Sequence, residues 1–170
     1  MNHLRLTILL TLGGIVLLCL MIAAATFFMP YRGMAGFFPP DVQEALRPRL
    51  DAIDRQPKAP RIFGGVLIVL MCMMFAGLYI IGGIDGLHHQ FTYRDFLLRF
   101  LIISFGTKAF DIIALDFFLL TKTQFFPRIF PETKDCAGWQ QFGYNRKQQL
   151  SQCVIMLICC IAMAFVFAKL

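Results

Sequence analysis

Four stretches of the chain are apolar over enough residues to cross a membrane. An α-helix needs about 20 apolar residues to cross about 30 Å of hydrocarbon. Three of the stretches contain no charged side chain, and the third in chain order contains several. The pattern predicts an all-α fold, an integral membrane bundle of four transmembrane helices forming a single transmembrane domain over residues 1–170. The expected spans are residues 6–29, 62–84, 96–120 and 150–168.

The predicted span 96–120 is unusual because it places charged groups in hydrocarbon. Each such group costs about 2.5 kcal/mol or more at the bilayer centre, so it needs a partner or a water-filled path. Lys108 is the midpoint of this span. On an α-helix, Ser104 and Asp111 lie one turn before and after it, whereas Asp116 falls to the other side, about 12 Å further along the axis. We therefore expect an intramembrane charged site of Lys108, Asp111, Asp116 and Ser104.

Two interpretations of this site stay open. In the first, Lys108 and Asp111 form a buried ion pair that only fixes how the spans pack. In the second, the charged groups move a proton or an ion, or bind a polar headgroup, because ionisable groups inside a membrane are functional candidates by default. Asp116 is expected at the cytoplasmic rim, partly hydrated.

The first long loop contains an amphipathic pattern. Val42, Ala45, Leu46, Leu50 and Ile53 recur at helical spacing after Pro39-Pro40. The pattern predicts a short amphipathic segment on the cytoplasmic membrane surface, with Asp41 as its N-cap. Packing of this segment against the second long loop is the alternative.

The second long loop, residues 121–149, contains the run Phe125–Glu132, in which phenylalanine and proline alternate. Proline removes a backbone donor and biases the preceding residue towards an extended form, so an irregular interfacial or shallow re-entrant loop is expected. Trp139, Phe142 and Tyr144 are then expected in the headgroup layer. Candidate contacts to a lipid headgroup are Arg128, Glu132, Tyr144 and Arg146.

Composition and charge support a membrane protein and set its expected orientation. The chain is 58% hydrophobic, with a mean hydropathy of +0.69 and a net charge of +6. Loops 30–61 and 121–149 carry eleven of the 16 Lys and Arg residues. Basic loops face the cytoplasm, which predicts a multi-pass protein of the cell inner (plasma) membrane with both termini outside. No Lys/Arg run is long enough to indicate nucleic-acid binding.

Metal ligands and cofactor motifs give only weak signals. His88 and His89 lie with Asp85 and Asp95 in the expected outer loop, and imidazole with carboxylate can bind a transition metal. Because adjacent histidines do not easily face one ion, we interpret them as interfacial polar residues and predict no metal and no cofactor. The six cysteines include no Cys-x-x-Cys, which argues against disulfide exchange and a zinc site.

One part of the chain resembles a known group of proteins. The stretch Phe110–Phe118, followed by Phe130–Thr133 and Phe142–Tyr144, resembles a family of uncharacterised small bacterial integral membrane proteins with four spans. Those proteins share a span with two aspartates, then a Pro/Gly-acidic turn and an aromatic-basic segment. The resemblance implies a membrane fold and carries no activity.

Three functional hypotheses follow. The first is an oligomeric transport or channel component that uses the buried Lys/Asp network. The second is a non-catalytic membrane or assembly subunit whose charges only fix packing. The third is a lipid-modifying enzyme at the cytoplasmic face. The chain has no P-loop, Gly-x-Ser-x-Gly or His-Glu-x-x-His motif, so no catalytic residue is predicted. The expected partners are the lipid bilayer and either a second copy of the chain or another membrane subunit.

Overall fold

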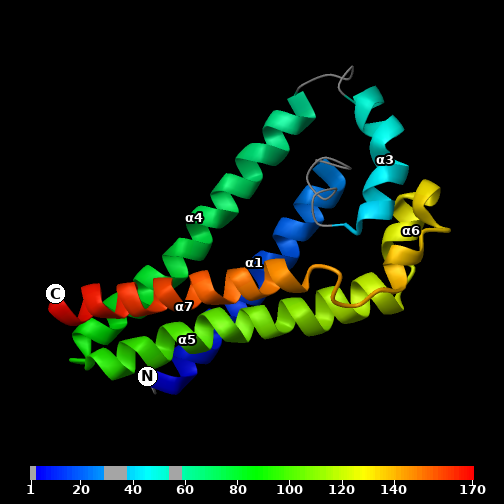
Figure 1. Ribbon diagram of the computed structural model, residues 1–170. Coiled ribbons are helices and arrows are strands. Elements are labelled where there is room, and N and C mark those ends of the chain that lie inside the picture. Colours follow the sequence, from blue (N-terminus) through cyan, green and yellow to red (C-terminus); the bar gives the residue numbers. More distant parts are fainter. Residues whose placement is uncertain (1–2, 29–37, 54–58) are drawn as a thin grey trace. The chain divides into compact units, whose positions relative to one another are not determined.

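The computed structural model describes residues 3–28, 38–53 and 59–170, which contain helices and no strand (Figure 1). The α-helices are α1 (His3–Phe28), α3 (Pro40–Ile53), α4 (Ala59–His88), α5 (Tyr93–Phe110), α6 (Phe125–Ile129) and α7 (Arg146–Lys169). The π-helix η1 (Asp111–Lys122) follows α5 directly, and the 3₁₀ turns η2 (Pro131–Thr133) and η3 (Ala137–Gln140) follow α6.

Three described helices are long and apolar enough to cross a membrane: His3–Phe28, Ile62–His88 and Arg146–Lys169. They confirm three of the predicted spans, each longer at one or both ends. Most of their large apolar side chains are exposed, as expected for helices in lipid, whose tails are as apolar as leucine. Residues 96–120 are helical as α5 and η1. They are not among the candidate spans, because charged residues interrupt their apolar sequence.

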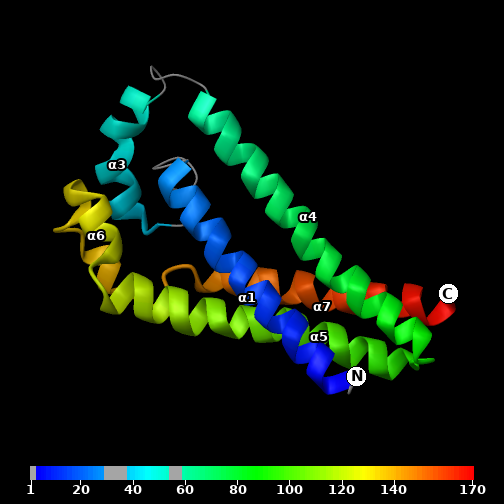
Figure 2. The ribbon, with the colours of Figure 1, turned by 180° about the vertical axis from the view of Figure 1, so that it is seen from behind.

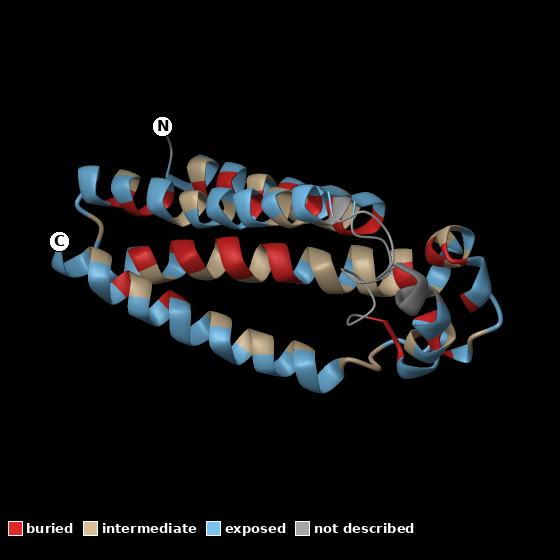
Figure 3. Ribbon diagram, turned by 90° about the horizontal axis from the view of Figure 1, so that it is seen from above, coloured by how far each residue is buried: buried red, intermediate tan, exposed pale blue. Residues whose placement is uncertain are grey.

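The chain divides into two compact units, and unit 1 comprises Met1–Cys19, Met71–Phe110 and Lys147–Leu170. Helix α5 is the most buried helix of unit 1 (Figure 3). Its Phe96 and Phe100 pack on Cys160 and Ala164 of α7. These side chains form the apolar core of unit 1.

Glycines allow α1 to approach α5 closely within unit 1. A Cβ atom on Gly14 would lie 2.8 Å from the Thr107 hydroxyl oxygen, and one on Gly106 would lie 2.7 Å from Cγ2 of Thr11. Small residues at such contacts let helix backbones pack at short range in membranes. Either side chain would therefore push the two helices apart.

Unit 2 comprises Leu20–Leu70 and Asp111–Arg146, and its core joins the two long loops. In this unit α3 lies beside α6 and the turn after it (Figures 1 and 2). The buried cluster consists of Ala25, Phe38, Val42, Leu46, Leu120, Phe126, Phe130 and Trp139. The rings of Phe126 and Trp139 stack with centroids 5.7 Å apart, and Phe38 meets Trp139 edge-on at 4.9 Å.

The amphipathic segment of the first loop is a helix, as predicted, but its apolar face is covered. Val42 and Leu46 are fully buried against the second loop. This burial supports the packing alternative over a helix lying on the membrane surface. The side chains of Leu50 and Ile53 are not among those that the structure describes, so the prediction for them is not tested. Residues 29–37 and 54–58 also lie outside the described part of the chain.

Asp41 is not the N-cap of α3, because the helix begins at Pro40. Its carboxylate instead accepts a hydrogen bond of 2.8 Å from the backbone N–H of Gly138. Asp41 therefore ties α3 to the second loop. A Cβ atom on Gly138 would lie 2.2 Å from Oδ1 of Asp41, so this contact requires glycine.

The Phe-Pro run is more regular than predicted. Phe125–Ile129 forms one helical turn and Pro131 begins a 3₁₀ turn. Pro127 is the third residue of α6. The backbone N–H at this position has no acceptor within the helix, so proline is tolerated there. Proline thus shortens this helix instead of preventing it.

Trp139 is buried in the core of unit 2, and its predicted place at the depth of the headgroup layer stays a prediction. Its indole N–H donates to the carbonyl oxygen of Thr133 at 2.9 Å. This bond satisfies the polar end of the ring away from water, which is the usual condition for burying tryptophan. Phe142 is exposed and Tyr144 is half-buried.

We predict that Phe130→Ala destabilises unit 2 by about 3–5 kcal/mol, because it removes a fully buried ring and leaves a cavity. Trp139 is the only tryptophan, so its emission during urea unfolding in micelles reports on this unit. Phe142→Ala, at a ring that is 55% exposed, is the matched control and should change stability by no more than about 0.5 kcal/mol. Equal effects of the two substitutions would contradict the proposed core.

Candidate functional site

Arg99 is fully buried near the start of α5 and has an acidic partner. Its Nη1 atom donates to Oδ2 of Asp85 at 2.8 Å and to the carbonyl oxygen of Gly82 at 2.6 Å. The guanidinium carbon lies 4.3 Å from the centroid of the Phe91 ring. Nε and Nη2 have no hydrogen-bond partner within the described part of the chain. This ion pair between α5 and the end of α4 was not predicted, because its two residues lie 14 positions apart in the sequence.

Ser104 joins three helices. Its hydroxyl lies 2.8 Å from the phenol oxygen of Tyr79 on α4 and 3.2 Å from the Cys160 sulfur on α7. Hydroxyl groups both donate and accept, and thiols do so weakly, so the three groups can form a short hydrogen-bonded chain. The sequence placed Ser104 on the same stripe as Lys108, but gave no sign of these partners.

Lys108 is buried on α5, and its ammonium donates to Oε1 of Gln152 on α7 at 2.7 Å. A hydrogen bond from a charged group to a neutral amide is stronger than one between two neutral groups. The predicted ion pair with Asp111 stays a prediction. Lys108 thus has a partner on another helix, which was not predicted because it lies 44 residues away.

The change from α-helix to π-helix alters how the two aspartates are placed. In a π-helix the backbone hydrogen bonds join residues five apart. Residues five apart therefore lie on the same face, as residues four apart do in an α-helix. The bond of 3.1 Å from the N–H of Thr123 to the carbonyl of Phe118 has this spacing. Asp111 and Asp116 both belong to η1, so they share a face instead of lying far apart around the helix, as α-helical geometry predicted.

The two aspartates of η1 lie near Tyr144 and Asn145 within unit 2. The amide of Asn145 donates to Oδ2 of Asp116 at 3.3 Å. Burial raises the pKa of the Tyr144 phenol well above its usual range, and the charges of Asp116 and Asp111 raise the pKa further. The phenol therefore stays protonated at neutral pH and can donate a hydrogen bond. The structure thus brings together three predicted site residues: Asp111, Asp116 and Tyr144.

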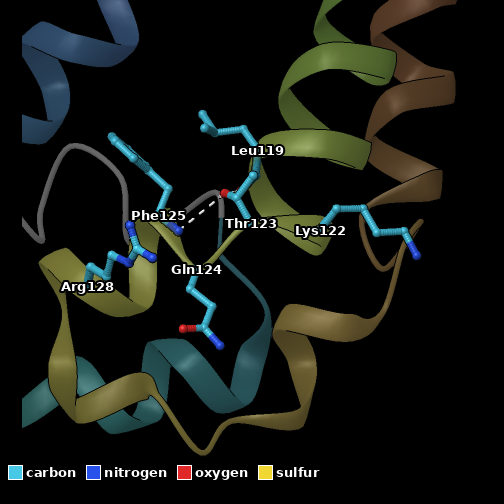
Figure 4. Close-up of a pocket in the computed structure, with 6 residues that line it drawn as sticks. All are labelled: Leu119, Lys122, Thr123, Gln124, Phe125 and Arg128. Carbon is cyan, nitrogen blue, oxygen red and sulfur yellow. Dashed lines mark hydrogen bonds between the residues drawn. The ribbon is translucent and has the colours of Figure 1, made fainter.

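The end of η1 and the start of α6 form an open pocket of about 440 Å³ (Figure 4). Its lining combines apolar and polar side chains: Leu119, Lys122, Thr123, Gln124, Phe125 and Arg128. The ammonium of Lys122 points away from Arg128 (Figure 4) and lies 5.3 Å from the centroid of the Phe117 ring. Of the predicted headgroup contacts, Arg128 lines this pocket, whereas Glu132 and Arg146 are exposed elsewhere in unit 2.

A separate group of metal-ligating residues lies in unit 1. One ligand atom each from His3, Asp85 and His89 falls within 4.8 Å of the other two. His88, the neighbour of His89 in sequence and a weak candidate ligand, does not belong to this group. His3 was not predicted as a member of this group, because nothing in the sequence shows that the start of α1 meets the end of α4.

Comparisons with known proteins give no further assignment: no family model, no curated protein and no solved structure matches this chain. The resemblance to small four-span membrane proteins therefore stays a prediction.

We predict that Gln152→Leu destabilises the protein by about 1.5–3 kcal/mol, because it removes a hydrogen bond to a buried charge. In the Lys108→Met background the same substitution should cost little, since the charge is gone. Unfolding in mixed micelles, followed by circular dichroism, gives the interaction energy as a double-mutant cycle. Gln148→Leu, at an exposed residue of the same helix, is the control. Additive effects would show that the contact between Lys108 and Gln152 contributes nothing.

Proposed function

We propose that the protein is a four-span protein of the plasma membrane and a component of an oligomeric transport or channel assembly, with residues 96–120 as its fourth span. One observation carries the proposal: polar side chains at successive levels of α5 each bond to a group on another helix. Arg99 bonds to α4, Ser104 to α4 and α7, and Lys108 to α7.

Energetics favours a membrane location for this helix despite its charges. An unpartnered charge in hydrocarbon is costly, but Arg99 is paired with Asp85, and the ammonium of Lys108 is bonded to Gln152. Both charges are buried in a unit whose other helices expose apolar side chains. A helix with this arrangement can occupy the interior of a bundle while its neighbours face lipid.

Transport is favoured by the chemistry of the bonded groups. Tyr79, Ser104 and Cys160 can each accept and donate a proton, and chains of such groups can relay protons between polar ends. Along α5, the pair of Asp85 and Arg99 lies on one side of these three hydrogen-bonded groups, and Lys108 lies on the other.

The proposed orientation places loops 30–61 and 121–149 in the cytoplasm and both termini outside. The excess of Lys and Arg in these two loops supports it, because basic loops stay on the cytoplasmic side. A transport path through 170 residues would be narrow, so we propose that several copies, or a partner membrane subunit, complete it.

The second candidate is a subunit whose polar contacts only hold its helices together. The burial of Lys108 and its bond of 2.7 Å to Gln152 favour this function, because a buried charge that has a partner on another helix can serve packing alone. The third candidate, an enzyme acting on lipid headgroups, is favoured only by the pocket beside Arg128, where guanidinium could bind phosphate.

A flux measurement tests the transport proposal. In liposomes with an internal pH dye and a potassium diffusion potential set by valinomycin, the wild-type protein should move protons faster than empty liposomes do. Ser104→Ala should lower this flux to the empty-liposome rate, because it breaks the hydrogen-bonded chain. Ser151→Ala removes an exposed hydroxyl of α7 and should leave the flux unchanged. If the wild-type protein moves neither protons nor alkali cations, or if Ser104→Ala has no effect, the proposal is wrong.

A further inference from the structure

Three metal-ligating side chains meet at one end of unit 1, apart from the polar contacts of Ser104 and Lys108. His3 lies at the start of α1, Asp85 lies in the last turn of α4, and His89 directly follows that helix. Their ligand atoms fall within 4.8 Å of one another, close enough for one ion to bind all three after small movements of the side chains. Two of the three are a helical turn apart in sequence, and the third comes from a distant part of the chain.

The end of α4 holds Asp85 and His89 on one side. The backbone N–H of His89 bonds to the carbonyl of Asp85 at 3.2 Å, so the helical turn continues to His89 and residues four apart share a face. Nδ1 of His89 lies 2.8 Å from the same carbonyl oxygen. When Nδ1 donates there, Nε2 carries the lone pair, and metal-binding histidines are commonly held by such a bond to a backbone carbonyl.

The carboxylate and the second imidazole are also held in place. Arg99 donates to Oδ2 of Asp85 at 2.8 Å, while Oδ1 lies 3.5 Å from Nδ1 of His89. Arg99 therefore fixes the carboxylate by one oxygen, as outer groups around metal sites often do. The His3 ring meets the rings of His89 and Phe91 edge-on, with centroids 4.5 Å and 5.0 Å away.

We propose that His3, Asp85 and His89 bind a divalent transition metal ion, with zinc as the best fit. Two imidazoles and one carboxylate match the nitrogen and oxygen ligands of zinc sites that keep a fourth position open. Calcium and magnesium prefer oxygen ligands alone, so this set selects against them. Since both histidines are exposed and Asp85 is partly exposed, an ion can enter from solvent. The bound ion would link the start of α1 to the end of α4.

The test uses the full chain in detergent, without a polyhistidine tag and after treatment with a chelator. Calorimetric titration with ZnCl₂ should show one site per chain, and CoCl₂ should give the visible absorption bands of a four-coordinate site. His3→Ala and His89→Ala should each weaken zinc binding by at least about tenfold. His88→Ala is the matched control, because His88 is the exposed neighbour outside the cluster, and it should leave the affinity unchanged.

The outcomes are distinct. Loss of binding in His3→Ala and His89→Ala, with circular dichroism and elution volume unchanged, supports the site. Wild-type protein that shows no saturable zinc binding, or that loses as much affinity with His88→Ala as with His89→Ala, overturns it. The result is independent of proton flux, since neither histidine belongs to the contacts of Ser104 and Lys108.

Discussion

A charged side chain buried away from water must find a partner, and this constraint accounts for the packing of α5 against its neighbours in unit 1. Arg99 and Lys108 are both on α5, and their partners Asp85 and Gln152 come from α4 and α7. A helix with such needs has to be surrounded by others. Helices α1, α4 and α7 have long stretches without charge, so they can supply the outer faces. The burial of α5 follows from its polar residues as much as from Phe96 and Phe100.

In unit 2 the constraint is the burial of apolar side chains, and the two long loops meet it by folding onto each other. Phe38, Val42 and Leu46 from the first loop need burial, and the Phe-Pro run with Trp139 provides the surface that covers them. Asp41 and Thr133 satisfy the backbone N–H of Gly138 and the indole N–H of Trp139, so the core closes without buried donors being left over at these positions. The loops are therefore a small packed unit. Within unit 2, the packed loops bring Tyr144 and Asn145 near Asp111 and Asp116 of η1.

The sequence predicted what depends on local pattern and missed what depends on distant contact. Three spans were found because each is a continuous apolar run, and the amphipathic period of residues 42–53 correctly predicted a helix. The partners of Arg99, Lys108 and Asp116 lie 14, 44 and 29 residues away, beyond any helical spacing. The π-helix was missed because the aspartates were placed with α-helical geometry, and the π-helix is a rare form. The proximity of His3 to Asp85 and His89 was missed because it joins residues that are far apart in the sequence.

The central claim is that α5 and η1 cross the membrane as a fourth span. Gln90 and Gln140 are exposed residues on either side of this helix, and only α5, η1 and the short helices after them lie between the two in sequence. In a variant with its native cysteines replaced by alanine, Gln90→Cys and Gln140→Cys would each be tested for labelling by a membrane-impermeant maleimide in intact cells. We expect labelling at residue 90 from outside, and at residue 140 only after the membrane is permeabilised. Labelling of both residues from the same side would show that this helix does not span the membrane and would contradict the account.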